Sequence, residues 1–170
     1  LPEGAEEGIR KGLYLLEAGA EAKKAPRVQL LGSGAILREV LAAADLLRDD
    51  WGVAADVWSA PSFTELARDA QAAERWNLLH PDETPKVSWV ERCLAGRPGP
   101  VIAATDYMRL YAEQIRAFVP APYRVLGTDG FGRSDSRVNL RRFFEVDANQ
   151  IDVQGLILFS ASAPNSMYSP

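Results

Sequence analysis

The chain is poor in the residues that most often carry metal and redox chemistry. Its 170 residues include one cysteine, Cys93, and one histidine, His80. A single thiol excludes a disulfide within the chain and a cysteine-rich zinc site, and a single imidazole excludes a multi-histidine metal centre. The chain therefore has few of the side chains from which active sites are usually built.

The chain also lacks a basic surplus and long apolar runs. Its 19 lysine and arginine residues stand against 23 acidic ones, a net charge of -4, so we expect no nucleic-acid partner. The apolar runs are only a few residues long, so we expect no membrane span, and the first residues are charged where a secretory signal would be apolar. With 47% hydrophobic and 25% charged residues, the composition predicts a small cytoplasmic globular protein.

Short apolar runs alternate with segments of helical periodicity along most of the chain. Four compact runs are typical of buried strands: 28–31, 53–58, 101–104 and 123–127. A strand-helix-strand order at this spacing implies right-handed crossovers. We therefore predict an α/β fold in three layers (α/β/α), with a mostly parallel, open sheet covered by helices on both faces.

Helices are expected between these strands. The segment 35–50 carries its apolar residues on one face. Ser62 and Glu65 match a capping box, in which a hydroxyl and a carboxylate satisfy the first N–H groups of a helix, and its buried stripe is predicted to be Phe63, Leu66, Ala67 and Ala70. Further helices are predicted at 4–18, 87–94, 105–118 and 135–144, the third with an apolar face of Tyr107, Leu110, Tyr111, Ile115 and Phe118.

The composition divides the chain into three parts. Residues 1–26 are predicted to be a helical lead-in, and residues 27–148 the α/β domain. Residues 149–170 form an atypical tail whose only charged residue is Asp152. We expect the tail either to be poorly ordered or to add an extended segment around 155–159, and a continuous helix from 149 to 161 would contradict this.

The turn Gly32-Ser33-Gly34 is the first candidate binding site. It joins a strand to a helix, where backbone N–H groups and the helix dipole can hold a phosphate. A dinucleotide fingerprint needs a third small residue three positions after the second glycine, and that position is Leu37. We favour the alternative, a tight turn that needs only a flexible backbone.

The single histidine and cysteine are weak candidates for catalysis. His80 follows a predicted helix, where it could act as a general base. The more common role at this place is to end the helix, with the ring satisfied by a carbonyl. For Cys93 no local signature supports a nucleophile, so we favour a mostly buried, inert thiol.

The most unusual stretch is the loop 128–137, TDGFGRSDSR. Two glycines flank an aromatic residue at the carboxyl end of a predicted strand, where open parallel sheets carry function. The arginines here can bind an acidic partner or a phosphate, or they can pair with local acids on a solvated surface. The candidate contact residues are Asp129, Phe131, Arg133, Asp135, Arg137 and Arg141.

The segment YRVLGTDGFGRSDSRVNLRRFFEVD resembles the C-terminal region of the homodimeric bacterial pyruvate dehydrogenase decarboxylating components. Four other segments resemble the same family in the same order: LPEGAEEGIRKGLYLLE, VQLLGSGAILREV, DWGVAADVWSAPSFTELARDAQAAERWNLLHP and AATDYMRLYAEQIRAFVP. The likeness runs from Leu1 to about Ala148. After Ala148 the family continues into a charged amphipathic helix, and this chain does not.

The resemblance implies a transketolase C-terminal-like domain cut from a larger enzyme. That enzyme uses thiamine diphosphate and magnesium to decarboxylate pyruvate and passes the acetyl group to lipoyl groups. The chain matches only the third domain and the linker before it, so the resemblance implies no catalytic, cofactor or metal residue here. Asp129-Gly130 lacks the downstream asparagine of the magnesium motif, and Asn139 lies on the next predicted helix.

The implied role is support of the dimer and of the larger complex, and we expect the isolated chain to be inactive. The implied partners are the other domains of the parent subunit, a second subunit, and the lipoyl acyltransferase core. One alternative is a stand-alone anion- or nucleotide-binding α/β module that uses the Gly32–Gly34 turn and the arginines. Another is a protein-interaction domain that recruits the acyltransferase subunit.

Overall fold

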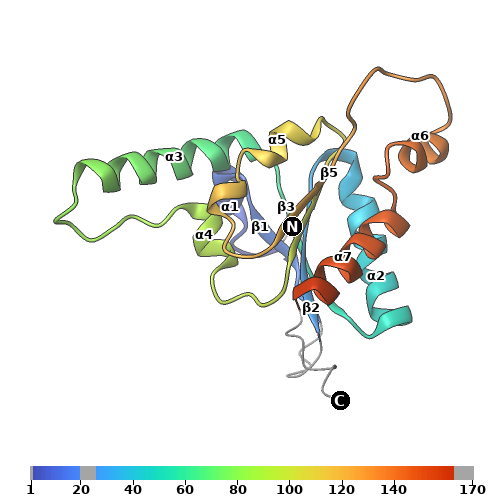
Figure 1. Ribbon diagram of the computed structural model, residues 1–170, viewed down its shortest axis with the longest axis horizontal. Helices are drawn as coiled ribbons and strands as arrows, with labels where there is room; N and C mark the ends of the chain where they lie inside the picture. The colour runs from blue at the N-terminus through green and yellow to red at the C-terminus, as the bar shows by residue number, and fades with distance from the viewer. Residues whose placement is uncertain (1, 20–25, 163–170) are drawn as a thin grey trace, which may run out of the picture.

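A five-stranded sheet forms the centre of the molecule, as the computed structural model shows for residues 2–19 and 26–162 (Figure 1). The strands lie in the order β1-β3-β2-β4-β5. The last four pair in parallel, and β1 pairs with β3 antiparallel at one edge. Their bounds are β1 Tyr14–Glu17, β2 Arg27–Gly32, β3 Ala54–Ser59, β4 Val101–Ala104 and β5 Tyr123–Leu126.

Helices cover both faces of this sheet. Their bounds are α1 Glu6–Lys11, α2 Leu37–Trp51, α3 Phe63–Leu79, α4 Trp89–Leu94, α5 Arg109–Glu113, α6 Arg137–Phe143 and α7 Ala148–Ser162, with 3-10 turns η1 Gly34–Ile36 and η2 Arg116–Phe118. Figure 1 shows α3, α4 and α5 on one side of the sheet and α2 and α7 on the other. The predicted three-layer α/β fold is therefore confirmed.

Successive side chains of the inner strands enter two separate cores, because side chains alternate across a strand. On β4, Val101 and Ala103 pack with α3, α4 and α5, whereas Ile102 and Ala104 pack with α2 and α7. All four side chains are buried. Because the inner strands are buried on both faces, their sequences are continuous apolar runs. The four predicted strands are confirmed as β2, β3, β4 and β5.

The predicted helix 4–18 forms only in its first part, and the predicted helical lead-in 1–26 likewise; residues 1 and 20–25 lie outside the described residues. Helix α1 ends at Lys11, because Gly12 takes a left-handed conformation (φ 92°) and closes the helix end. The chain then enters the sheet as β1, which pairs with β3. Pairing with an open sheet edge outweighs the helical spacing of the apolar residues.

The predicted helix 105–118 is wrong. The side chain of Thr105 accepts a hydrogen bond from the Tyr107 N–H (3.1 Å), and this turn delays the helix. What forms instead is the five-residue α5 and the turn η2. Of the predicted apolar face, Ile115 is buried, whereas Tyr107 and Leu110 are 57% and 66% exposed.

The prediction for the tail is contradicted over its described part. Residues 148–162 form one continuous helix, α7, instead of an extended or poorly ordered segment. The helix packs against the second core, with Ile151 fully buried and Gly155 in van der Waals range of Leu47 and Ile102. A short apolar run does not distinguish a strand from a buried helix. Here packing against the second core favours the helix. Residues 163–170 lie outside the described residues.

Two helix starts show how local chemistry fixes α3 and α4. Ser62 caps α3 by accepting from the Glu65 N–H (3.1 Å), but the Glu65 carboxylate pairs with Arg68 instead of completing a box. The complete capping box lies at the start of α4, between Ser88 and Glu91, and the sequence analysis did not single it out. The predicted stripe is confirmed: Phe63, Leu66, Ala67 and Ala70 are all buried.

Candidate functional site: the carboxyl end of the sheet

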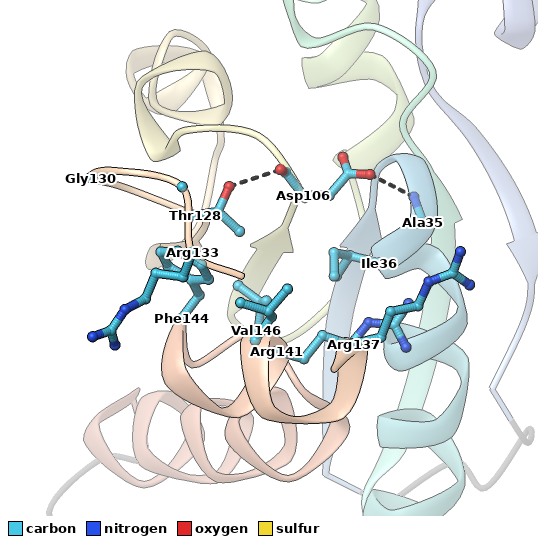
Figure 2. Close-up of a pocket in the computed structure, with 12 residues that line it drawn as sticks. Ala35, Ile36, Asp106, Thr128, Gly130, Arg133, Arg137, Arg141, Phe144 and Val146 are labelled. Atoms are coloured by element: carbon cyan, nitrogen blue, oxygen red, sulfur yellow. Dashed lines mark hydrogen bonds between the residues drawn. The ribbon is translucent and has the colours of Figure 1, made fainter. Parts of the chain in front are cut away.

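The loops that follow β2, β4 and β5 meet at the carboxyl end of the parallel strands. The chain leaves β3 on one side of β2 and returns as β4 on the other side. Such a switch point opens a crevice between the two neighbouring strand ends, which is the usual ligand site of open α/β sheets. Figure 2 shows the residues that line this region.

Asp106, two residues after β4 ends, connects the three loops. Its Oδ2 accepts a hydrogen bond from the Ala35 N–H (2.9 Å), and its main-chain oxygen accepts one from the Thr128 hydroxyl (2.8 Å; Figure 2). The carboxylate lies where a side chain at position 34 would be, and Gly34 has a positive φ of 59°. Both facts favour glycine at this position.

This geometry contradicts a phosphate site at the Gly32–Gly34 turn. The N–H of Ala35, which would face a bound anion, already donates to the chain's own carboxylate. A second negative charge at this place would be repelled by Asp106. The alternative, a tight turn that needs a flexible backbone, is confirmed. The nucleotide-binding interpretation depended on the N–H groups of this turn, so it is no longer supported here.

A hollow of about 480 Å³ lies beside this turn, between η1, α6 and the loop after β5. Ile36, Leu140, Phe144 and Val146 give it an apolar floor. Apart from Ala35, the remaining lining is polar or glycine and includes three of the predicted contact residues: Arg133, Arg137 and Arg141.

These three arginines do not form one anion site. Arg141 pairs with Glu39 of α2 (2.6 Å), and Arg133 lies over the ring of Phe143 (3.9 Å from the guanidinium carbon to the ring centroid). Figure 2 shows the guanidinium groups of Arg133 and Arg137 pointing to opposite sides of the hollow. The structure brings the arginines to the same rim but does not make them converge.

The two acidic candidates hold the loop in shape. Asp129 accepts from Arg109 through its Nε (2.5 Å) and its main-chain N–H (2.9 Å), and these bonds hold the pKa of Asp129 below its ordinary value. Asp135 accepts from the Asn139 side chain and the Ser136 N–H, which likewise lower its pKa. Between them Phe131 is 96% exposed.

Asp129, which the sequence analysis compared with the magnesium motif, is not available to a metal ion. Asp129 is already bound by Arg109. Over residues 2–19 and 26–162, no three histidine, cysteine or acidic side chains lie close enough together to hold a metal ion. In that same part of the chain, no helix has the length and apolar character needed to cross a membrane.

His80 and Cys93 have the structural roles favoured from sequence. The ring Nδ1 of His80 lies 2.8 Å from the Trp76 carbonyl oxygen, at the end of α3, and the two rings stack at 3.5 Å. Cys93 is partly buried beside the first core, and burial raises the pKa of its thiol to about 11. A thiol that stays protonated at neutral pH is a poor nucleophile.

Sequence reasoning missed Asp106 as the residue that joins the loops. The available signal was an acidic residue two positions after one strand, and a glycine-rich turn after the neighbouring strand. Parallel pairing of β2 with β4 brings those two positions together.

Comparison with known proteins places these features in a family. Residues 12–147 match the family described as transketolase-like TK C-terminal domain. The chain is 66% identical to a pyruvate dehydrogenase E1 component of Pseudomonas aeruginosa over 159 residues, and 60% identical to that of Escherichia coli over 157 residues. Each match covers 92% of this chain but only 18% and 17% of those proteins. The predicted resemblance is confirmed.

Solved structures agree on the fold. Transketolase from Leishmania mexicana superimposes with a TM-score of 0.59 at 20% identity, over 96% of this chain and 21% of that one. The Pseudomonas match also bears on the tail. Its 92% of 170 residues is about 156, more than the 148 residues that end at Ala148, so the likeness extends into the segment thought to be atypical.

Proposed function

Because the chain belongs to the family of transketolase-like C-terminal domains, we propose that it is the C-terminal domain of a pyruvate dehydrogenase E1 component and serves the assembly of that enzyme. One observation carries the proposal. The chain is 66% identical to such a protein over nearly its whole length, yet it spans less than a fifth of that protein. The chemistry of the parent is therefore assigned to parts that this chain does not contain.

The parent enzyme is proposed to decarboxylate pyruvate and to pass the acetyl group to lipoyl groups of an acyltransferase core. Thiamine diphosphate and magnesium would supply that chemistry on other domains. Among the described residues no three histidine, cysteine or acidic side chains are grouped to hold magnesium, and we assign no step of the reaction to this chain. The short apolar runs favour a cytoplasmic enzyme.

The loop 128–136 supports a role in assembly. The pairs Asp129–Arg109 and Asp135–Asn139 fix its two ends, while Phe131 at its tip is almost fully exposed. A large aromatic side chain on a preorganised loop is typical of the residues that dominate protein interfaces. The proposed partners are another domain of the parent subunit and a second subunit.

A chimera tests the proposal directly. The C-terminal region of the Pseudomonas aeruginosa E1 component is replaced with this chain, and pyruvate decarboxylation is measured. We expect activity near that of the parent from the chimera, and none above a vector control from the isolated chain. Activity of the isolated chain, or an inactive chimera that folds and assembles normally, would contradict the proposal.

Charge reversal tests the assembly role. In the chimera, Arg133→Glu with Arg137→Glu should weaken subunit association, measured by sedimentation over a range of concentrations. Arg141 is left unchanged because it holds Glu39 within the domain. Arg38→Glu on the exposed side of α2 is the control. An association constant equal to that of the control would count against this surface.

A further inference from the structure

A helical arm projects from the side of the domain, away from the site described above. The arm comprises residues 71–87, the distal half of α3 and the loop that returns to α4. Figure 1 shows it extending beyond the other helices that cover the sheet. None of its residues is buried, so the two cores of the domain do not account for its conformation.

Contacts within the arm hold it in one shape. The ring of Trp76 stacks on His80 (3.5 Å), and the Nζ of Lys86 lies 3.4 Å from the Trp76 ring centroid. The side chain of Asn77 donates to the Lys86 carbonyl (2.9 Å) and accepts from the Lys86 N–H (2.7 Å). The side chains of Trp76 and Asn77 thus join the helix to the returning loop. An element ordered before it meets a partner loses less entropy on binding.

The arm presents apolar side chains to solvent. Leu78 is 76% exposed, Leu79 60% and Val87 53%. At the base of the arm, a groove of about 410 Å³ runs between α3 and the turn η2, with Leu78 and Phe118 in its lining. Single exposed apolar residues are common on proteins, but a group of them on one rigid projection indicates an interaction surface.

The length of the relatives bears on what could cover the arm. The chain spans less than a fifth of the length of its curated relatives, so most of the longer polypeptide lies outside the structure. The arm points away from its own domain, which cannot cover it (Figure 1). Asp82 and Glu83 follow the two leucines and are exposed, so a complementary surface would have lysine or arginine at its rim.

We propose that the arm docks on another folded domain of the longer polypeptide and inserts Leu78 and Leu79 into an apolar recess with a basic rim. This rests on the proposed function, which supplies the second domain. The arm is separate from the loop that bears Phe131, so the two surfaces make independent contacts.

Hydrogen exchange in the chimera tests the docking. Amides of residues 76–87 should exchange at least about tenfold more slowly in the chimera than in the isolated chain, because docking suppresses local opening. Leu78→Glu with Leu79→Glu should return the rates to those of the isolated chain. Ala42→Glu, on the exposed face of α2, adds a charge elsewhere and should leave the protection intact.

The outcomes separate this proposal from the proposed function. Equal exchange in the isolated chain and in an active chimera would overturn the docking. Concentration-dependent protection in the isolated chain, lost in the double variant, would identify a second copy as the occupant and overturn it as well. Protection of the arm in a chimera that does not decarboxylate pyruvate would support docking while contradicting the proposed function.

Discussion

Each end of the sheet has an aspartate, and the two aspartates differ in burial and in the contacts they make. At the amino end, Asp56 of β3 is fully buried. It accepts from the Arg27 guanidinium (2.5 Å), the Gln29 amide (3.0 Å) and the Gly19 N–H (2.9 Å), and Arg97 lies 3.5 Å away. Every contact is internal, so this cluster stabilises the domain and ties the segment after β1 to the sheet.

At the carboxyl end, Asp106 is exposed and joins loops through one backbone N–H and one hydroxyl. Water can replace each of those contacts at small cost. The comparison indicates that the role of a charged side chain depends on which end of the parallel strands it occupies. At the amino end it is enclosed by the domain, whereas at the carboxyl end it shapes a surface that other molecules can reach.

The largest expected effect is at the amino end. Asp56→Ala removes the buried carboxylate that faces the partly buried guanidinium of Arg27 and the buried amide of Gln29, and breaking a buried ion pair costs about 3–5 kcal/mol of unfolding free energy. Asp106→Ala should cost only about 1 kcal/mol, because the groups it leaves can turn to water. Urea denaturation of both variants measures the difference. Equal losses would show that the two ends do not differ in this way.

Two glycines sharpen the same contrast. A methyl group at Gly99 (φ 93°) would collide with the main-chain carbonyl of Arg27, which cannot move, so Gly99→Ala should cost more than about 2 kcal/mol. At Gly34 the obstacle is the mobile carboxylate of Asp106, so Gly34→Ala should cost about 1 kcal/mol.

The double variant of Gly34→Ala with Asp106→Ala isolates the contact at the carboxyl end. Its loss should be smaller than the sum of the two single losses, because the obstacle is gone. Strict additivity in urea denaturation would show that the carboxylate does not limit position 34.

Asp152, a carboxylate with no cation beside it among the described residues, should have an effect of intermediate size on the free energy of unfolding. That effect should depend on pH. Asp152 of α7 is 8% exposed and its Oδ1 has no hydrogen-bond partner among the described residues. Burial raises its pKa and the nearby charge of Asp50 adds to this, while a hydrogen bond with Trp51 partly offsets it. Since the pKa is higher in the folded state, stability falls as the pH rises from the unfolded-state value of about 3.9 through the raised one.

Asp152→Asn should remove this part of the pH dependence and raise stability at neutral pH by up to about 1 kcal/mol. Denaturation of both proteins between pH 4 and 8 measures it, and the difference between the two curves cancels the other titrating groups. Parallel curves over that range would contradict a penalty for the ionised side chain.

The smallest effect on the isolated chain is expected at the tip of the loop. Phe131→Ala removes a side chain that is 96% exposed, so the unfolding free energy should change by less than about 0.5 kcal/mol. In the chimera the same change should weaken subunit association, measured by sedimentation. A large loss of stability in the isolated chain would show that Phe131 packs within the domain.

Local patterns were sufficient where one pattern favours one structure. The run at 101–104 is β4, and the stripe that begins at Phe63 is the buried face of α3. The strongest site prediction, the loop 128–137, lies where predicted, with Ser136 starting the next helix. Its arginines, however, are divided among Glu39, Phe143 and solvent.

The sequence by itself determined the four parallel strands, the helices α2 and α3, and the family, because these depend on side-chain periodicity and on long ordered similarity. Only the tertiary structure decided that residues 14–17 are a strand and that residues 148–162 are a core helix. It also decided that Asp106 occupies the glycine turn. Each of these depends on a neighbour distant in sequence: an open sheet edge, an apolar face of α2, and the end of a parallel strand. The spacing of residues along the chain does not show which distant segments pack together.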